Sequence, residues 1–369
     1  MSSYYHARIP LLSPRHPYPY PYPPPIHPSY TDGTVLVTHG GTEMGQGLHT
    51  KICQVAATAF GIPVTDVHVA ETATDKVPNS SPTAASMSSD LYGMAVLDAC
   101  TQIKRRLVPY AVAPEEGKEG KTDASEEAAD LVASAAFKAT VVAAFFDRVN
   151  LSAQGYYAVP NIGYDWNMDT DDNTERFNGS QGPFNYYTYG TALSEVEIDT
   201  LTGDFRVMRA DVMMDVGNTL NPALDIGQIE GAFVQGLGWC TMEELVWGDR
   251  EHSWIRPGNL FTAGPGTYKI PSFNDVPVDM RITLLKDATN PRAIHSSKAV
   301  GEPPLFLAAS AFFAVREAIQ AARDDAGLEG WFDLACPATS ERVRMACQDQ
   351  FTGRFVDAGD QEWRARQSL

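Results

Sequence analysis

Cysteines are few in this sequence, and none of them has the spacing of a metal site. The five residues, Cys53, Cys100, Cys240, Cys336 and Cys347, are scattered, and no pair has CxxC spacing. An iron–sulfur or structural zinc site within the chain is therefore not expected. Their odd number and apolar surroundings are typical of free thiols in a reducing compartment, which favours a cytoplasmic protein.

Basic residues are also scarce. The chain has 28 Lys and Arg against 46 Asp and Glu, which gives a formal net charge of -18 at pH 7. Such an acidic balance disfavours nucleic acid or an anionic membrane as a partner. We expect no membrane contact, because no run looks apolar enough to cross a bilayer and the N-terminus lacks the apolar core of a signal peptide.

Common catalytic motifs are missing as well. The sequence has no GxSxG elbow, and its Gly-rich stretch at residues 40–47 is neither GxGxxG nor a Walker loop. His39 and His49 flank that stretch without a third ligand at metal spacing, so we interpret them as structural.

Hydrophobic periodicity and turn residues predict a mixture of strands and helices. Strands are expected at residues 33–38, 67–71, 194–199, 205–216 and 280–285, and helices at 48–60, 91–107, 131–149, 222–244 and from 305 onward. Gly61 should end the first helix, and residues 200–204 should form a hairpin turn. Because strands and helices do not alternate regularly, we predict an α+β fold with mixed sheets and packed helices.

Composition divides the chain into three parts. Residues 1–30 contain a Pro/Tyr-rich run and are expected to form a disordered tail. Residues 31–352 should form the folded region, with two subdomains and a charged insertion at about 112–130. Residues 353–369 are interpreted as a C-terminal tail.

A single carboxylate, Glu302, lies where an apolar helix begins, in the run KAVGEPPLF at residues 298–306. Prolines fit the first helical turn, whose N–H groups have no intrahelical partner. The positive helix end favours an ionised carboxylate, while apolar neighbours would raise its pKa. This combination is compatible with a general base, and an acidic helix cap is an equally good interpretation.

Three further polar elements could bind a ligand. The glycines of Gly45-Gln46-Gly47 allow close approach of a backbone to a phosphate at the following helix start, although the stretch could also be a tight turn closed by the Gln amide. The small-residue loop at residues 80–89 suits a polar cofactor or an ordinary Ser-rich helix cap. Gln228, an uncharged polar residue on an apolar helix, needs a partner in the protein or in a ligand.

Six stretches together closely resemble the C-terminal half of the molybdenum domain in the xanthine dehydrogenase family of molybdenum hydroxylases. In chain order they are VTHGGTEMGQGLHTK, VPNSSPTAASMSSDL, LSEVEIDTLTGD, MDVGNTLNPALDIGQIEGAFVQGLG, GTYKIP and SKAVGEPPLFLAAS. The resemblance runs from about residue 26 to residue 352. It implies the fold of the second molybdopterin-binding domain of the xanthine dehydrogenase and aldehyde oxidase type.

The resemblance also implies roles for particular residues. Glu302 matches the glutamate that serves the family as catalytic base, and Ala85 matches the residue nearest molybdenum. Molybdopterin contacts are implied for the loop, helix and turn residues that match the family motifs: Met44, Gly45, Gln46, Thr83, Ala84, Ala85, Ser86, Ser88, Gln228 and Gly301.

The implied reaction is hydroxylation of hypoxanthine or xanthine to urate, and the PTAAS form of the loop favours purines over aldehydes. The family's FAD, 2Fe-2S clusters and NAD belong to upstream domains that this chain does not resemble, and its enzymes are homodimers. We therefore expect a purine substrate, a partner in the upstream half of the molybdenum domain, in cis or in trans, and no activity of the chain alone. The alternatives are an aldehyde oxidase-like hydroxylase and a non-catalytic fragment that acts only through binding.

Overall fold

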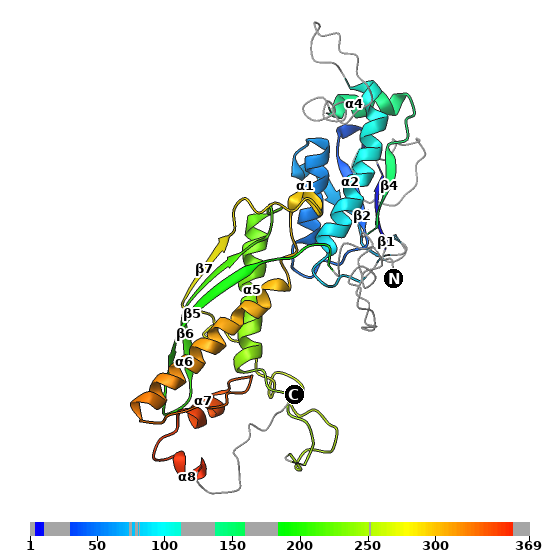
Figure 1. Cartoon of the computed structure of the whole chain (residues 1–369). Coiled ribbons are helices and arrows are strands. Elements are labelled where there is room, and N and C mark those ends of the chain that lie inside the picture. Colours follow the sequence, from blue (N-terminus) through cyan, green and yellow to red (C-terminus); the bar gives the residue numbers. More distant parts are fainter. Residues whose placement is uncertain are drawn as a thin grey trace, which may run out of the picture. The chain divides into compact units, whose positions relative to one another are not determined.

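The computed structural model describes residues 4–10, 30–73, 76–77, 80, 82–111, 137–158, 184–250 and 252–356. Contacts divide the chain into two compact units, which are treated separately below (Figure 1). Unit 1 comprises residues 1–187, 218–221 and 289–299, and unit 2 comprises residues 188–217, 222–288 and 300–369.

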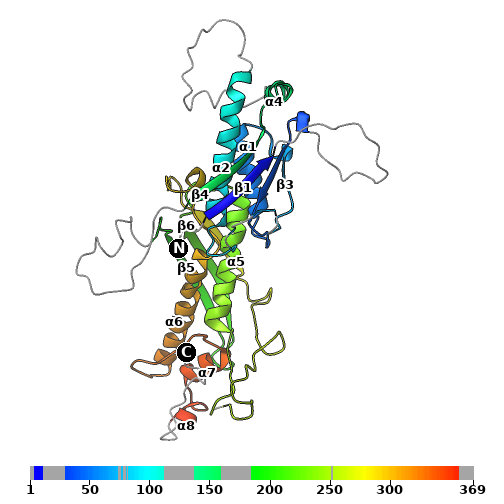
Figure 2. The same ribbon diagram turned by 90° about the vertical axis from the view of Figure 1, so that its right-hand side faces the viewer.

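Unit 1 contains a four-stranded mixed sheet in the order β3-β2-β1-β4. Strand β1 is antiparallel to β2 and β4, and β2 is parallel to β3. Helix α2 lies alongside this sheet (Figure 2). The elements of unit 1 are β1 (Tyr4–Pro10), η1 (Tyr30–Asp32), β2 (Val35–His39), α1 (Leu48–Phe60), η2 (Val64–Asp66), β3 (Val67–Val69), α2 (Ser88–Leu107), η3 (Val108–Tyr110), α4 (Phe137–Phe146), β4 (Ser152–Ala158) and η4 (Ile294–Ser296).

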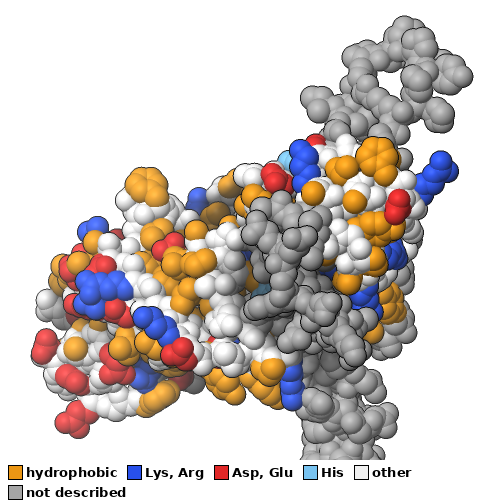
Figure 3. All heavy atoms as spheres, turned by 90° about the horizontal axis from the view of Figure 1, so that it is seen from above, with side chains coloured by type: hydrophobic (Ala, Val, Ile, Leu, Met, Phe, Trp, Pro, Cys, Tyr) orange, Lys and Arg blue, Asp and Glu red, His pale blue; other side chains and the backbone are white. Residues whose placement is uncertain are grey.

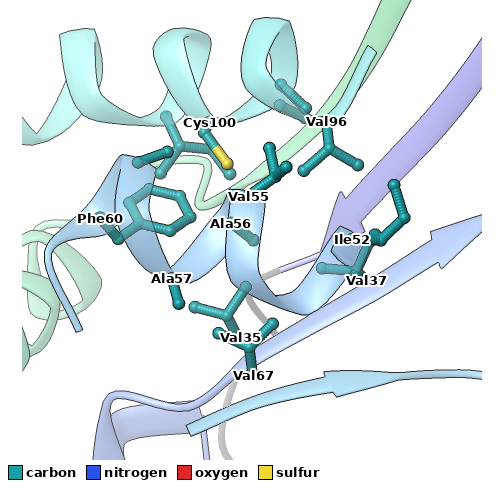
Figure 4. Close-up of a cluster of buried hydrophobic side chains, with 14 of the residues drawn as sticks. Val35, Val37, Ile52, Val55, Ala56, Ala57, Phe60, Val67, Val96 and Cys100 are labelled. Carbon is teal, nitrogen blue, oxygen red and sulfur yellow. The ribbon is translucent and has the colours of Figure 1, made fainter. Parts of the chain in front are cut away.

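The core of unit 1 forms where α1 packs against β2 and against α2 (Figure 4). Alternate residues of β2, Val35 and Val37, point inward against Ile52 of α1, as expected for a strand with one buried face. Helix α1 ends at Gly61, whose φ of 66° places it in the left-handed region that glycine adopts without strain. This core holds the beginning of α1 in place beside the Gly-rich loop.

Unit 2 contains a three-stranded mixed sheet in the order β5-β6-β7, with β5 antiparallel and β7 parallel to β6. Helices α5 and α6 lie along one face of it (Figure 1). The elements of unit 2 are β5 (Gly190–Ile198), β6 (Phe205–Met214), α5 (Pro222–Thr241), β7 (Asp279–Leu284), η5 (Pro303–Ala308), α6 (Ala309–Asp325), α7 (Ser340–Cys347) and α8 (Gly353–Val356).

The core of unit 2 is built by inward-facing residues of β6 and one stripe of α5. Val207 and Val212 pack with Phe233 and Leu237, and Ala308 at the end of η5 joins the same cluster. Charged residues of the strands pair locally, as in Arg209 Nε with Asp211 Oδ2 at 2.6 Å. Acidic and basic side chains are likewise interspersed on the face that Figure 3 shows.

The predicted α+β class and mixed sheets are confirmed. The N-terminus differs from the expectation of a tail, because Tyr4–Pro10 forms strand β1. Its backbone pairs with β4 from Tyr4–Ala158 to Pro10–Ser152, so long-range hydrogen bonds supply an order that the composition of residues 1–30 did not indicate. The charged insertion expected at about 112–130 lies outside the described residues, as do 11–29 and 357–369.

The expectation that no segment is apolar enough to span a bilayer is wrong by composition. Pro303–Asp325, which combines η5 and α6, is long enough and has a mean hydropathy of 1.4 over its most apolar window. Core helices of globular domains pass the same test, and Val315 and Ile319 of α6 are fully buried against α7 and neighbouring residues. Of the most apolar window, 22% is buried inside the structure.

Candidate functional site

The Gly-rich loop of unit 1 closes on itself around Glu43. The Glu43 carboxylate accepts hydrogen bonds from the N–H groups of Gly45 (2.9 Å), Gly47 (3.0 Å) and His49 (3.0 Å). Partial burial alone would raise the pKa of this carboxyl, but those N–H donors hold the pKa below its usual value. Glu43 thus occupies three N–H groups that a phosphate at the beginning of α1 would otherwise use, and phosphate binding there stays a prediction.

The Gln46 amide is hydrogen-bonded within the same loop. Its Oε1 accepts from Met44 N at 2.6 Å, and its Nε2 donates to Thr42 O at 2.9 Å. The alternative of a turn closed by the Gln side chain thus describes the local geometry. It does not exclude a ligand, because Nε2 keeps a second proton and Oε1 a second lone pair.

Two histidines, His39 and His49, lie at the two ends of this loop and contact each other. The fully buried His39 accepts from Gly41 N at its Nδ1 (3.1 Å), and its Nε2 lies 3.1 Å from His49 Nδ1. Burial lowers the pKa of His39 to about 4, and the neighbouring His49 lowers it further than Glu43 raises it. His39 is therefore neutral at pH 7, and its Nε2 carries the proton that it donates to His49, so its role is structural as expected.

The small-residue loop lies next to the Gly-rich loop, because Thr42 N donates to Thr83 Oγ1 at 2.9 Å. Ala85 and Ser86 have φ angles of 55° and 54°, in the left-handed region that non-glycine residues rarely adopt. Two such residues in succession store strain, which is a feature of ligand-binding and active-site segments. Ala84 and Ala85 are exposed within this chain, and Ser88 begins α2.

Gln228 lies on α5 in unit 2 and is half-buried. Its side-chain amide has no hydrogen-bond partner among the residues that the structure describes. At the adjacent Gly227 an added Cβ would meet nothing within 4 Å, so the helix surface is open there. An amide without a protein partner beside open space is suited to bind a polar ligand group.

Glu302 occupies the N-cap position of η5, with prolines in the first turn as predicted. Its side chain makes no capping hydrogen bond, and the residue is exposed. The structure therefore disfavours the interpretation of Glu302 as an acidic helix cap. The neighbouring helix is a 3-10 turn over Pro303–Ala308 before α6, rather than one helix from residue 305.

The predicted site residues fall into two groups. In unit 1 a hydrogen bond joins the loop of Met44, Gly45 and Gln46 to the loop of Thr83 through Ser88. In unit 2 the helix carrying Gln228 packs directly on η5, which follows Gly301 and Glu302. Gly236 of α5 marks this contact, because a Cβ there would lie 2.1 Å from Leu305 O.

The donors of these groups fit an uncharged, polar cofactor such as a pterin. They are amides, hydroxyls and backbone groups at strained or open positions, with neither Lys nor Arg among them. Over the described ranges no group of three or more His, Cys, Asp or Glu could hold a metal ion.

Sequence reasoning missed a buried polar network behind the small-residue loop. Asp90 of α2 is buried and accepts a hydrogen bond from Tyr186 Oη, which in turn accepts from Ala299 N at 2.9 Å. The nearest signal was an acidic residue in the first turn of a helix, which is normally read as a solvated helix end.

Comparison with known proteins extends the motif resemblance. The chain is 57% identical over 329 residues to xanthine dehydrogenase 1 of Arabidopsis thaliana, covering 89% of this chain and 22% of that protein. It is 50% identical over 326 residues to xanthine dehydrogenase/oxidase of Mus musculus, covering 88% and 22%. The chain thus spans about a fifth of the length of these curated relatives.

Solved structures share the fold at low sequence identity. Quinoline 2-oxidoreductase from Pseudomonas putida 86 aligns with a TM-score of 0.67 and 22% identity, over 94% of this chain and 38% of that one. Aldehyde oxidoreductase from Desulfovibrio gigas aligns with a TM-score of 0.61 and 21% identity, over 94% and 30%.

A sequence model described as "Molybdopterin cofactor-binding domain" matches residues 28–277, more than half of the chain. The matched residues include both loops of unit 1 and Gln228. On the strength of this match, the chain belongs to the molybdopterin cofactor-binding domain family.

Proposed function

We propose that this chain is the C-terminal molybdopterin-binding part of a xanthine dehydrogenase-like hydroxylase, with Glu302 as the catalytic base and a purine as substrate. In this reaction a ring C–H of hypoxanthine or xanthine becomes C–OH, the oxygen comes from water, and two electrons and two protons are released. When bound, the molybdenum cofactor supplies the centre that accepts those electrons.

The observation that carries the proposal is the link between the two loops of unit 1. The Thr42–Thr83 hydrogen bond holds the Gly-rich loop beside the strained Ala85–Ser86 turn. This arrangement occurs in a chain 57% identical to a xanthine dehydrogenase. Strained residues of this kind cluster at active sites and ligand-binding segments.

The chain's residues have distinct proposed roles. Backbone and hydroxyl groups at Thr83 through Ser88, with Met44, Gly45 and the spare capacity of the Gln46 amide, bind the polar edge of the pterin. Gln228 and Gly301 contribute a second set of contacts. Ala85 has a methyl side chain, so the segment nearest the metal leaves room for substrate.

Glu302 takes the proton from the attacking water-derived oxygen in this proposal. An exposed carboxylate without a capping hydrogen bond is able to accept a proton from a ligand placed beside it. The prolines after it fix the backbone of the first turn and so limit the positions that the carboxylate can reach.

The test is Glu302→Gln in the complete enzyme that carries this segment. Glutamine keeps the size of the side chain but cannot take a proton, so we expect the rate of reduction by xanthine to fall about 10²–10⁴-fold with molybdenum content unchanged. Stopped-flow absorbance measures that rate.

Glu317→Gln on α6 is the matched control, because its side chain is 76% exposed and lies outside the proposed site. If Glu302→Gln reduces at the same rate as Glu317→Gln, Glu302 is not the base. If the unsubstituted enzyme oxidises aldehydes and leaves xanthine untouched, the purine assignment is wrong.

A further inference from the structure

Residues 289–299 (gold in Figure 1) belong to unit 1, although residues of unit 2 precede and follow them in the sequence. Several contacts anchor this segment within unit 1. Ile294 is fully buried in the core of unit 1. Arg292 donates to Asn185 O at 2.7 Å, and Asn185 Nδ2 donates back to Arg292 O at 3.3 Å. These contacts fix the segment to α2 and to residues 184–187.

The same segment is held in a strained conformation. His295 and Ser296 have φ angles of 48° and 62°, again two consecutive non-glycine residues in the left-handed region. Ser296 O accepts from Asn218 N at 2.8 Å. Strained residues such as these persist only where the surrounding structure holds them in place.

Tyr186 makes the last anchor of this segment before the chain leaves unit 1. Its Oη accepts a hydrogen bond from Ala299 N at 2.9 Å and donates one to Asp90 Oδ2. Ala299 is the last residue of unit 1 in this part of the chain, and Glu302 follows three residues later. Asp90 lies in the first turn of α2, directly after the strained small-residue loop.

The electrostatics of this network fix the direction of each hydrogen bond. Burial and the neighbouring Asp90 charge raise the pKa of Tyr186, so its hydroxyl keeps its proton and is the donor to Asp90. Burial raises the pKa of Asp90 to about 6, opposed by the Tyr186 hydrogen bond and by the Lys51 charge. With its proton directed at Asp90, Tyr186 Oη presents a lone pair to the Ala299 N–H.

We propose that Tyr186, oriented by Asp90, is a positioning residue for Glu302. The pair fixes the backbone at Ala299, from which the chain reaches Glu302 three residues later. If the Tyr186–Ala299 hydrogen bond served stability alone, water or a backbone oxygen could accept from the Ala299 N–H. No buried carboxylate would then be needed to orient the Tyr186 hydroxyl. This inference rests on the function proposed above.

The experiment compares four variants of the complete enzyme. Tyr186→Phe removes the hydroxyl, and Asp90→Leu removes the group that orients it. Asp90→Asn keeps an oxygen that can accept from Tyr186 and is the conservative rescue. Tyr187→Phe is the matched control, because it removes a hydroxyl from the adjacent residue, which is 53% exposed.

We expect Tyr186→Phe and Asp90→Leu to reduce kcat for xanthine about 10- to 100-fold, because misplacing a catalytic group by about 1 Å costs up to 10²-fold in rate. KM and molybdenum content should change less than threefold, and Asp90→Asn should retain most of kcat. If Tyr186→Phe matches Tyr187→Phe in kcat, or loses molybdenum and kcat in proportion, the positioning role is refuted.

Hydrogen exchange provides a readout that does not depend on activity or on folding of a single variant. In the peptide containing Ala299 we expect exchange to accelerate at least tenfold in Tyr186→Phe and Asp90→Leu, but not in Asp90→Asn, while β7 is unchanged. Unchanged exchange at Ala299 in all three variants refutes the anchor itself.

The outcome separates this inference from the proposed function. An unsubstituted enzyme that does not oxidise xanthine contradicts the function, whatever the exchange rates show. An active enzyme whose kcat depends on Glu302 but not on Tyr186 leaves the function intact and contradicts the positioning role.

Discussion

His39 is a buried titratable residue whose protonation opposes folding. Its pKa is lowered to about 4, whereas the unfolded chain protonates near 6.5. As pH falls from 6.5 towards 4, the unfolded state binds a proton that the folded state does not, so the His39 contribution to stability decreases by up to about 3 kcal/mol. Asp90 acts in the opposite sense, because its raised pKa lets the folded state bind a proton between about 6 and 3.8.

Because these two effects oppose each other, the prediction concerns a difference between proteins. We expect the stability of the unsubstituted chain relative to His39→Gln to decline as pH is lowered from 6.5 to 4.5, measured by urea unfolding at each pH. His68→Gln, which removes an exposed imidazole on β3, is the matched control. If the unfolding free energies of the unsubstituted chain and of His39→Gln change in parallel with pH, burial does not depress the pKa of His39.

Residue types alone indicated some roles correctly and concealed others. Pro303 and Pro304 indicated a helix start, and Gly61 a helix end, because each acts through the local backbone. Glu43 gave no such signal. Its function depends on a loop that folds back so that one carboxylate reaches three N–H groups, and the sequence spacing of those groups does not specify that fold.

At the scale of elements, the packing of α5 on η5 leaves no room for a side chain at Gly236. An added Cβ would lie 2.1 Å from Leu305 O, a backbone atom that cannot move without shifting η5. We expect Gly236→Ala to destabilise the chain by about 1–3 kcal/mol, measured by thermal or urea unfolding. Because η5 begins directly after Glu302, the same change should also displace the proposed base.

Gly231→Ala on the same helix is the matched control for stability. An added Cβ there meets nothing within 4 Å, so the change should stabilise the helix by up to about 1 kcal/mol through its higher helix propensity. Equal effects of the two substitutions would contradict the close approach of α5 and η5.

Local elements were largely predictable, and long-range order was not. The hairpin of β5 and β6 was expected because alternation and a TLTGD turn are encoded within one short stretch. Strand β1 was missed because its pairing partner β4 lies far along the chain and the intervening composition suggested a tail. Tyr186 was missed for the same reason, since its bonds reach Asp90 and Ala299 across 96 and 113 residues.

At the scale of the whole molecule, the chain matches only 22% of its Arabidopsis relative. We expect the purified chain, supplied with molybdopterin, to form no urate in steady state with an artificial electron acceptor, because the resemblance assigns the domains that carry electrons away, and the remaining substrate contacts, to other parts of the family enzyme. Urate absorbance measures turnover, and adding the upstream half of the molybdenum domain should restore it. Sustained turnover by the chain alone would contradict this expectation.

The two units are interleaved along the sequence. The chain passes from one to the other after residues 187, 217, 221, 288 and 299. A recombination breakpoint between residues 187 and 294 would therefore separate Ile294 from the core of unit 1 that it fills. A breakpoint between residues 228 and 300 would separate Gln228 on α5 from η5, the helix that follows Glu302. The two units cannot be exchanged between genes as separate modules, so residues on both must be inherited together.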